Sequence, residues 1–123
     1  MIYGIGTDIL EISRIKRTVK SKGFLKRVFS EKELELFKNK NMSPQTIAAN
    51  FCGKEAFFKA IGTGIIFSQI SKVSVLRDKS GRPYIYLEDE IKKQYDDLLF
   101  HITLSHTAEY AVAFVTAEKG EDK

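Results

Sequence analysis

One helix constrains the fold of this chain more than any other segment. A serine-proline pair at 43–44 is a typical helix start, because serine caps free amide groups and proline favours the first helical position. Apolar residues then recur at helical spacing as far as Ile61, and Gly62 is a typical stop. We therefore expect the longest helix of the chain over 44–61. Its apolar arc consists of Ile47, Ala48, Phe51, Phe58 and Ile61.

Two charged residues fall inside this apolar arc. At about 100° per residue, Glu55 lies roughly 80° from Ile47 and Lys54 roughly 20° from it, while Lys59 sits at the edge beside Glu55. Charged side chains are rarely buried unless they are paired or bind a ligand. A structural ion pair and a functional site both remain open from this pattern alone. A separate stripe of small residues, suited to close packing against another element, consists of Ala49, Gly53, Ala56 and Ala60.

The N-terminal segment 2–12 is rich in isoleucine and alternates as a buried strand. Two glycines on its inner face precede a carboxylate, which predicts open space beside Asp8 for a ligand that approaches the backbone. A bulge at either glycine, with the aspartate at the wet end of the strand, is the alternative. The residues on this face are Ile2, Gly4, Gly6, Asp8 and Leu10.

The remaining segments alternate between short helices and hairpins. Ser30 and Glu33 form a capping-box pattern that opens a helix ending near Asn39. The fold class is therefore α+β, with a mainly antiparallel sheet and one long helix packed on it. We expect a single domain over 1–123 whose last residues, 119–123, form a frayed tail. The other predicted elements are helices over 13–21, 24–29 and 88–98, a hairpin of 70–77 with 83–87, and a hairpin of 101–105 with 110–116.

Length and composition are those of one globular domain. The chain has 123 residues, of which 43% are hydrophobic and 29% charged, which excludes collagen-like and largely disordered classes. No apolar run approaches the roughly 18–20 residues of a membrane span, and the N-terminus lacks the pattern of a signal peptide. The lone cysteine, Cys52, excludes an intrachain disulfide and fits a reducing compartment. We therefore expect a cytoplasmic protein without a membrane partner.

The positive charge of the chain is concentrated in one segment. Residues 12–30 contain seven basic residues and no acidic one, while the rest of the chain contains 13 basic and 16 acidic residues. On a helix over 13–21, Arg14, Arg17 and Lys20 point outward. Such an unpaired face indicates a polyanionic partner, namely nucleic acid, a membrane surface, or an acidic protein or cofactor. A nucleic-acid-binding module, a non-catalytic interaction protein and a solvated face without a partner all stay open at this point.

The two carboxylates that packing alone does not explain, Asp8 and Glu55, indicate metal–phosphate chemistry. Carboxylate oxygens suit magnesium, which commonly takes one or two of them together with substrate phosphates. Lys54 and Lys59 flank Glu55 on the same helix and could neutralise such a phosphate. The chain has no Walker or dinucleotide fingerprint, no zinc spacing and no serine-histidine-aspartate arrangement. Two further segments carry suitable groups, the turn Gly62-Thr63-Gly64 and the run Ser105-His106-Thr107.

Several motifs, in this order, resemble those of the short bacterial 4′-phosphopantetheinyl transferases, the holo-acyl-carrier-protein synthase type. The resemblance spans essentially the whole chain, and the paired Gly-x-Asp and Lys-Glu-Ala-x-x-Lys-Ala patterns are its most specific parts. The motifs are Ile5-Gly6-Thr7-Asp8-Ile9 followed by Arg14, Phe29-Ser30-Glu31-Lys32-Glu33-Leu34, Lys54-Glu55-Ala56-Phe57-Phe58-Lys59-Ala60-Ile61-Gly62-Thr63-Gly64, Gly81-Arg82-Pro83-Tyr84 and Ser105-His106-Thr107.

The resemblance implies an enzyme that transfers 4′-phosphopantetheine from coenzyme A to a serine of apo-acyl carrier protein, and releases adenosine 3′,5′-bisphosphate. It implies that Asp8 and Glu55 bind Mg²⁺ and that Lys59 lies close to the coenzyme A phosphates. It also implies a homotrimer with active sites at subunit interfaces, and no nucleic-acid partner. The residues expected to bind the substrate are Lys54, Gly62, Thr63, Gly64, Pro83, Ser105, His106 and Thr107.

The resemblance also assigns the partner surface, and the chemistry of the implied reaction suggests the proton acceptor. Arg14 matches a basic residue that docks the acidic carrier protein, and Arg17 and Lys20 extend the same charged face. Glu55 is the first choice for the base that takes the serine proton, and Asp8 is the second.

One segment departs from the family pattern. Family members commonly carry Arg-Phe-Ala-Ala before the Lys-Glu motif, whereas this chain has Asn50-Phe51-Cys52-Gly53. A phosphate contact from residue 50 is therefore not expected, and Gly53 inside the helix should cost about 1 kcal/mol relative to alanine.

Overall fold

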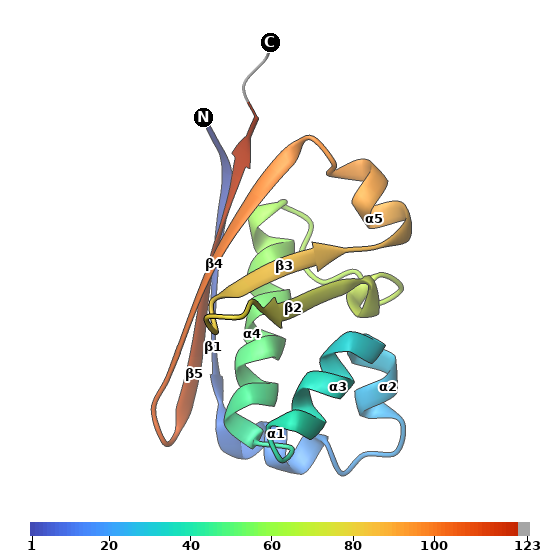
Figure 1. The fold of residues 1–123 in the computed structure, drawn as a ribbon, viewed down its shortest axis with the longest axis vertical. Helices are drawn as coiled ribbons and strands as arrows, with labels where there is room; N and C mark the ends of the chain where they lie inside the picture. Colours follow the sequence, from blue (N-terminus) through green and yellow to red (C-terminus); the bar gives the residue numbers. More distant parts are fainter. Residues whose placement is uncertain (121–123) are drawn as a thin grey trace.

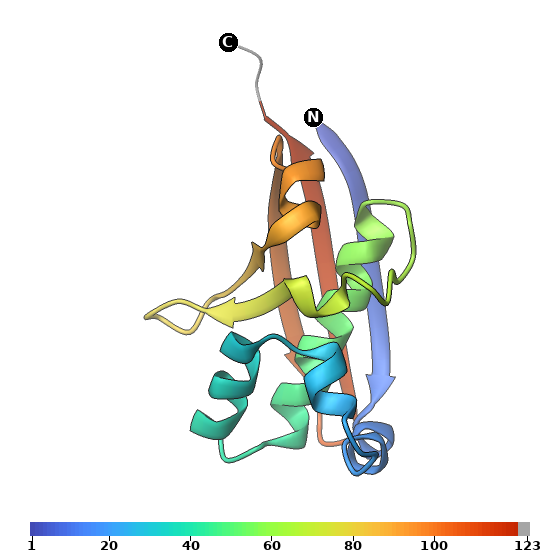
Figure 2. The ribbon, with the colours of Figure 1, turned by 90° about the vertical axis from the view of Figure 1, so that its right-hand side faces the viewer.

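The long predicted helix is the central element of the computed structural model, which describes residues 1–120. α4 (Pro44–Ala60) lies along a three-stranded antiparallel sheet of order β1-β5-β4, and the helices all lie on one side of that sheet (Figures 1 and 2). A second, two-stranded sheet of β2 and β3 packs over the same layer. The other elements are β1 (Ile2–Glu11), α1 (Ile12–Thr18), α2 (Phe24–Val28), α3 (Glu31–Asn39), a short 3₁₀ turn (Ile70–Lys72), β2 (Val73–Arg77), β3 (Pro83–Leu87), α5 (Asp89–Gln94), β4 (Leu98–His106) and β5 (Tyr110–Lys119).

The predicted α+β class and the order of its elements are confirmed, but the last segments differ in length. The helix predicted over 88–98 is shorter, because Leu98 already begins β4 and pairs with Lys119 of β5. The frayed tail predicted over 119–123 begins too early, because the same pairing makes Lys119 part of the sheet. Residues 121–123 lie outside the described residues. No helix among residues 1–120 combines the length and apolar character needed to cross a bilayer.

The glycines of β1 serve helix packing rather than ligand binding. A methyl group added at Gly6 would overlap the carbonyl oxygen of Ala56, and one added at Gly4 would overlap that of Ala60. The small-residue stripe predicted on the helix is therefore confirmed as a packing surface. The expectation of open space beside Asp8 is wrong, because α4 fills the space that the glycines leave. Their lack of side chains instead brings Asp8 next to the helix.

Gly53 has a similar role on the other flank of α4. A methyl group added there would lie 3.0 Å from side-chain atoms of both Ile102 in β4 and Val75 in β2. The helix, β4 and the two-stranded sheet thus meet at one point without room for a side chain. This close packing offsets the cost of a glycine within a helix.

A buried ion pair joins α3 to α4. Glu33 completes the predicted capping box with Ser30, and its carboxylate also lies 2.5 Å from the ammonium of Lys54. Both side chains are fully buried. Lys54 also donates hydrogen bonds to the carbonyls of Ile70 and Val73 at 2.9 and 2.5 Å. All three ammonium hydrogens therefore have a partner, which is the condition for keeping a charge in the interior.

Replacing Lys54 by methionine should lower the free energy of unfolding by roughly 3–5 kcal/mol, because the Glu33 carboxylate would stay buried without its counter-charge. The double variant Lys54→Met with Glu33→Gln should recover part of this loss. Urea unfolding followed by circular dichroism measures both. Equal stability of the single variant and the unchanged protein would contradict the importance of the pair.

Candidate active site

The close packing of β1 on α4 brings the two predicted carboxylates together. The Asp8 side chain is 13% exposed, and Glu55 is partly buried beside it. Burial raises the pKa of Glu55, and the charge of Asp8 and a hydrogen bond with Asp8 raise it further, to about 7. The nearby negative charge of Asp8 therefore favours the protonated form of Glu55 more than burial alone would.

Two cations flank this pair. The ammonium of Lys59 lies 3.6 Å from Asp8 Oδ1 and donates a hydrogen bond to the carbonyl of Thr7 at 2.9 Å. The Lys59 side chain remains 53% exposed, so its charge is also available to a ligand. Arg14 lies near the start of α1, close enough that its charge lowers the pKa of Glu55. The cluster is thus a carboxylate pair with positive charge on its rim.

The carboxylate pair fits a hard divalent cation. A cation beside Asp8 and Glu55 would relieve the repulsion that holds the proton, and carboxylate oxygens are the ligands that Mg²⁺ prefers. Within residues 1–120 there is no cluster of three or more His, Cys, Asp or Glu side chains that could hold a metal. The chain therefore offers two ligands here, and water or phosphate oxygens would complete the coordination shell.

Cys52 lies behind the pair and is unsuited to act as a nucleophile. The thiol is fully buried, and its sulfur lies 3.4 Å from the carbonyl oxygen of Ala111. Burial raises the pKa of this thiol, and the nearby charges of Asp8 and Glu55 raise it further. The residue therefore stays a neutral thiol, and forms an uncharged wall behind the carboxylates.

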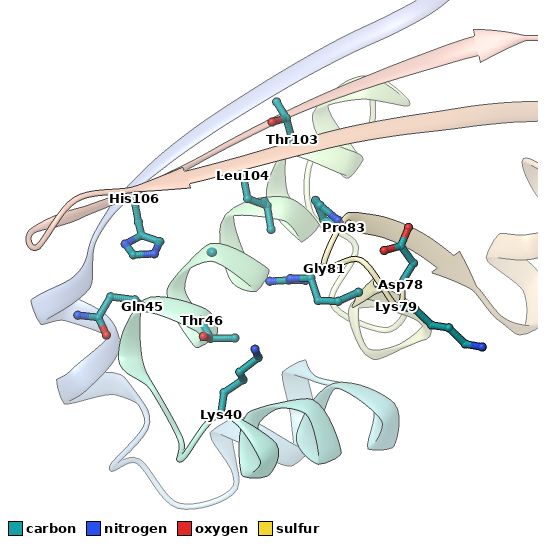
Figure 3. Close-up of a pocket in the computed structure, with 12 residues that line it drawn as sticks. Lys40, Gln45, Thr46, Asp78, Lys79, Gly81, Pro83, Thr103, Leu104 and His106 are labelled. Atoms are coloured by element: carbon teal, nitrogen blue, oxygen red, sulfur yellow. The ribbon is translucent and has the colours of Figure 1, made fainter.

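A pocket of about 490 Å³ lies between the first turns of α4, the end of β4 and the turn that joins β2 to β3 (Figure 3). The side chains of Lys40, Thr46 and His106 point toward the same space, whereas Lys79 points away from it. The pocket is within the size range of small-molecule sites, and its basic and hydroxyl groups suit an anionic ligand. Its remaining lining residues are Gln45, Ala49, Arg77, Asp78, Gly81, Pro83, Thr103 and Leu104.

α4 separates this pocket from the carboxylates. Glu55 meets Asp8 on β1, whereas Gly53 faces Ile102 on β4. β1 and β4 are the two opposite edges of the three-stranded sheet. Within one chain, the carboxylate cluster and the pocket therefore lie on opposite flanks of the same helix.

Only two of the predicted substrate-binding residues lie at the pocket. Pro83 and His106 both line the pocket. Ser105 is not part of its lining, because it follows Leu104 in β4 and alternation turns it to the other face. The hydroxyl oxygen of Thr107 accepts hydrogen bonds from the amides of Glu109 and Tyr110, and so closes the turn between β4 and β5.

The other predicted ligands lie away from the pocket. The prediction that Lys54 binds the substrate is wrong, because its ammonium is fully buried and fully bonded inside the protein. The Gly62-Thr63-Gly64 turn ends α4, where the amide of Gly62 donates to the carbonyl of Lys59. Both glycines have a positive φ, of 84° and 66°, which explains why glycine stands there. This turn directly follows the last turn of α4, which carries Lys59.

The predicted basic face is exposed as expected. Arg14 and Arg17 lie on the outer side of α1, while Ile12 and Ile15 are buried on its inner side. Lys20 follows the end of α1 and is also exposed.

Comparison with known proteins identifies the family. The model of the 4′-phosphopantetheinyl transferase superfamily matches residues 4–115. A holo-[acyl-carrier-protein] synthase of Clostridium botulinum is 41% identical over 121 residues, which cover 96% of this chain and 98% of that protein. The chain belongs to the 4′-phosphopantetheinyl transferase superfamily.

Solved structures of this superfamily have the same fold. The holo-(acyl-carrier-protein) synthase of Bacillus anthracis, solved in complex with CoA (3′,5′-ADP), has a TM-score of 0.83 and is 31% identical over 98% of this chain and 99% of that one. The enzyme from Neisseria meningitidis has a TM-score of 0.85 and is 32% identical over 97% of this chain and 100% of that one. The predicted family and fold, and the prediction of a phosphopantetheinyl transferase, are confirmed.

Sequence reasoning missed several residues of the pocket. The most informative is Arg77, which the hairpin register places directly opposite Pro83. Since Pro83 belongs to a family motif, pairing the two predicted strands in register would have found its neighbour. Lys40, Gln45 and Thr46 come from the loop before α4 and its first turn, and no sequence signal points to them.

Replacing Asp8 by asparagine should lower the pKa of Glu55 below its value of about 7, because the neighbouring negative charge disappears while burial remains. A titration of the ¹³C-labelled Glu55 carboxyl, in protein without added metal, measures the midpoint. An unchanged midpoint in Asp8→Asn would show that the two carboxyl groups do not interact.

Proposed function

We propose that this chain transfers the 4′-phosphopantetheine group of coenzyme A to a serine hydroxyl of an apo-acyl carrier protein, with Mg²⁺ bound by Asp8 and Glu55. The observation that carries the proposal is the carboxylate pair flanked by Lys59, in a chain of the phosphopantetheinyl transferase superfamily. The names of the similar proteins, and the coenzyme A in the Bacillus anthracis complex, support the same donor and acceptor.

The reaction forms one phosphate ester bond and breaks one diphosphate bond. The serine oxygen attacks the β-phosphorus of coenzyme A, and adenosine 3′,5′-bisphosphate leaves with the bridging oxygen. Glu55 would take the serine proton, directly or through a metal-bound water, and Asp8 is the second candidate for this role. The exposed ammonium of Lys59 stabilises charge on the phosphate oxygens. Mg²⁺ at Asp8 and Glu55 would polarise those oxygens and neutralise the charge of the leaving bisphosphate.

The pocket between α4, β4 and the β2–β3 turn would receive the nucleotide half of the donor. Lys40 and His106 supply polar contacts, and Pro83 supplies an apolar wall. Because α4 separates this pocket from the carboxylates, the simplest arrangement is a site shared between copies. The carboxylates of one protomer would then face the pocket of the next.

The outer face of the three-stranded sheet is the surface for such an assembly. Among residues 1–120, no helix covers this face (Figures 1 and 2). Ile5, Ile9 and Phe114 lie on it and are 59%, 64% and 41% exposed. Contiguous apolar surface of this kind usually marks a contact between proteins. With the family resemblance, this supports a homotrimer.

The function is tested by incubating the protein with coenzyme A, Mg²⁺ and an apo-acyl carrier protein, and then weighing the carrier by mass spectrometry. Asp8→Asn and Glu55→Gln should each reduce transfer by at least about 100-fold, because each removes a metal ligand. Glu35→Gln, an exposed carboxylate on α3, is the matched control. Near-normal transfer in both site variants at saturating Mg²⁺ would overturn the metal assignment.

The basic face should affect the KM for the carrier protein and not the KM for coenzyme A. Arg17→Glu should raise KM for the acidic carrier protein several-fold and leave KM for coenzyme A unchanged, and added salt should narrow the difference. Arg14→Glu should have the same effect and should also raise the pKa of Glu55, since its charge acts on that group. Steady-state kinetics with each substrate varied in turn measure both constants, with Lys92→Glu on α5 as control. An unchanged KM for the carrier protein would mean that the basic face has no partner.

Sedimentation equilibrium should show a trimer of about 42 kDa, three times the 14.0 kDa chain. Phe114→Arg should dissociate it, because a charge would be buried in the contact. Phe67→Arg should not, although Phe67 is 76% exposed, because it lies in the segment after α4 and not on the sheet. A monomer that still transfers at full rate would exclude the shared site.

A further inference from the structure

Arg77 is a partly buried cation without a carboxylate partner. It ends β2 and lines the pocket together with Lys40 and His106. Among residues 1–120, no Asp or Glu lies within ion-pairing distance of its guanidinium. Burial disfavours the charged guanidinium, and Glu33, the carboxylate whose charge acts on it, makes no direct ion pair with it. A partly buried cation of this kind in a pocket is suited to bind an anion.

Asn50 holds this guanidinium in place. The Asn50 amide is fully buried, and its Oδ1 accepts a hydrogen bond from Arg77 Nη2 at 2.9 Å. Its Nδ2 donates to Glu33 Oε2 at 2.9 Å and to the carbonyl of Val75 at 2.8 Å. Two acceptors on one side and a donor on the other fix the orientation of the amide, so Asn50 cannot turn without losing bonds.

The same amide keeps Arg77 apart from Glu33. Glu33 already holds Lys54 on its other oxygen, and Asn50 occupies the position between the carboxylate and the guanidinium. The charge of Arg77 is therefore not neutralised by an internal ion pair. Asn50 is also the residue at which this chain departs from the Arg-Phe-Ala-Ala pattern, and β2 supplies a cation beside that position.

Arg77 also retains free hydrogen-bond donors. Of its five N–H groups, the two on Nη1 contact the carbonyls of Val75 and Leu76 at 3.4 Å, and one on Nη2 is bound to Asn50. The Nε–H and the second Nη2–H have no acceptor among residues 1–120. Two donors on neighbouring nitrogens match two oxygens of one phosphate group.

We propose that Asn50 positions Arg77 to bind the 3′-phosphate of the donor, so that this pair distinguishes coenzyme A from donors that lack the group. The inference rests on the proposed function. Coenzyme A carries two phosphate-containing groups, and the diphosphate belongs at the carboxylate cluster, where the bond is broken. The phosphate monoester on the ribose is the remaining anion for the pocket on the other flank of α4.

The test compares coenzyme A with 3′-dephospho-coenzyme A as donors. In Arg77→Gln, KM for coenzyme A should rise about tenfold or more, while KM for the dephosphorylated donor should stay unchanged and kcat should change less. Asn50→Ala should also raise the KM for coenzyme A relative to the KM for the dephosphorylated donor. The double variant should have the same KM ratio as Arg77→Gln alone, because Asn50 acts through Arg77. Arg82→Gln is the matched control, since Arg82 lies in the turn that follows β2, is exposed and does not line the pocket.

A binding measurement separates this inference from the function itself. In calorimetric titrations, the unchanged protein should bind adenosine 3′,5′-bisphosphate more tightly than adenosine 5′-monophosphate. Arg77→Gln should lose this preference, and the measurement requires no transfer reaction. An equal change for both donors, no change for either, or additive effects of the two substitutions would overturn the role of the pair. Absence of transfer by the unchanged protein would instead overturn the proposed function. If Asn50→Ala does not fold, the comparison of the two donors in Arg77→Gln still tests whether Arg77 binds the 3′-phosphate.

Discussion

The contact between the backbones of β1 and α4 sets the geometry on which the rest of the molecule depends. Gly4 and Gly6 allow the strand to lie directly against the carbonyls of Ala56 and Ala60. At a normal strand–helix distance, Glu55 would lie farther from the Asp8 charge and closer to solvent, and its pKa would be raised less. The missing methyl groups thus produce both tight packing and the electrostatic coupling of the site.

A second set of contacts connects the core to the pocket. Glu33 is at once the cap of α3, the counter-charge of Lys54 and the acceptor for Asn50. Asn50 then reaches Arg77 at the pocket wall. Each polar group in this network is hydrogen-bonded to the next, and buried contacts therefore fix the position of the Arg77 cation at the pocket wall.

The sequence predicted the carboxylate cluster well, because that cluster depends on two local periodicities. A strand of period two places Asp8 inward, and a helix of period 3.6 places Glu55 toward it. Lys54 lies on the same helical face, and nothing local distinguishes a ligand from an ion-paired core residue. Its partner, Glu33, is already explained by the sequence as a capping residue of α3. Its second role, as the counter-charge of Lys54, depends on tertiary packing and has no local sequence signal. Pro83 and His106 were predicted from the family motifs, but the rest of the pocket was not, since Lys40, Arg77 and His106 meet only when three separate segments pack together.

The raised pKa of Glu55 has a consequence for the order in which the site is completed. Two adjacent negative charges would oppose the approach of β1 to α4 while the chain folds. Below about pH 7 Glu55 is mostly protonated and uncharged, and Lys59 lies beside the Asp8 carboxylate. The strand and the helix can then pack together without a cation. A cation bound by both carboxylates, as proposed above, would displace the proton of Glu55, so that loading the site would release acid.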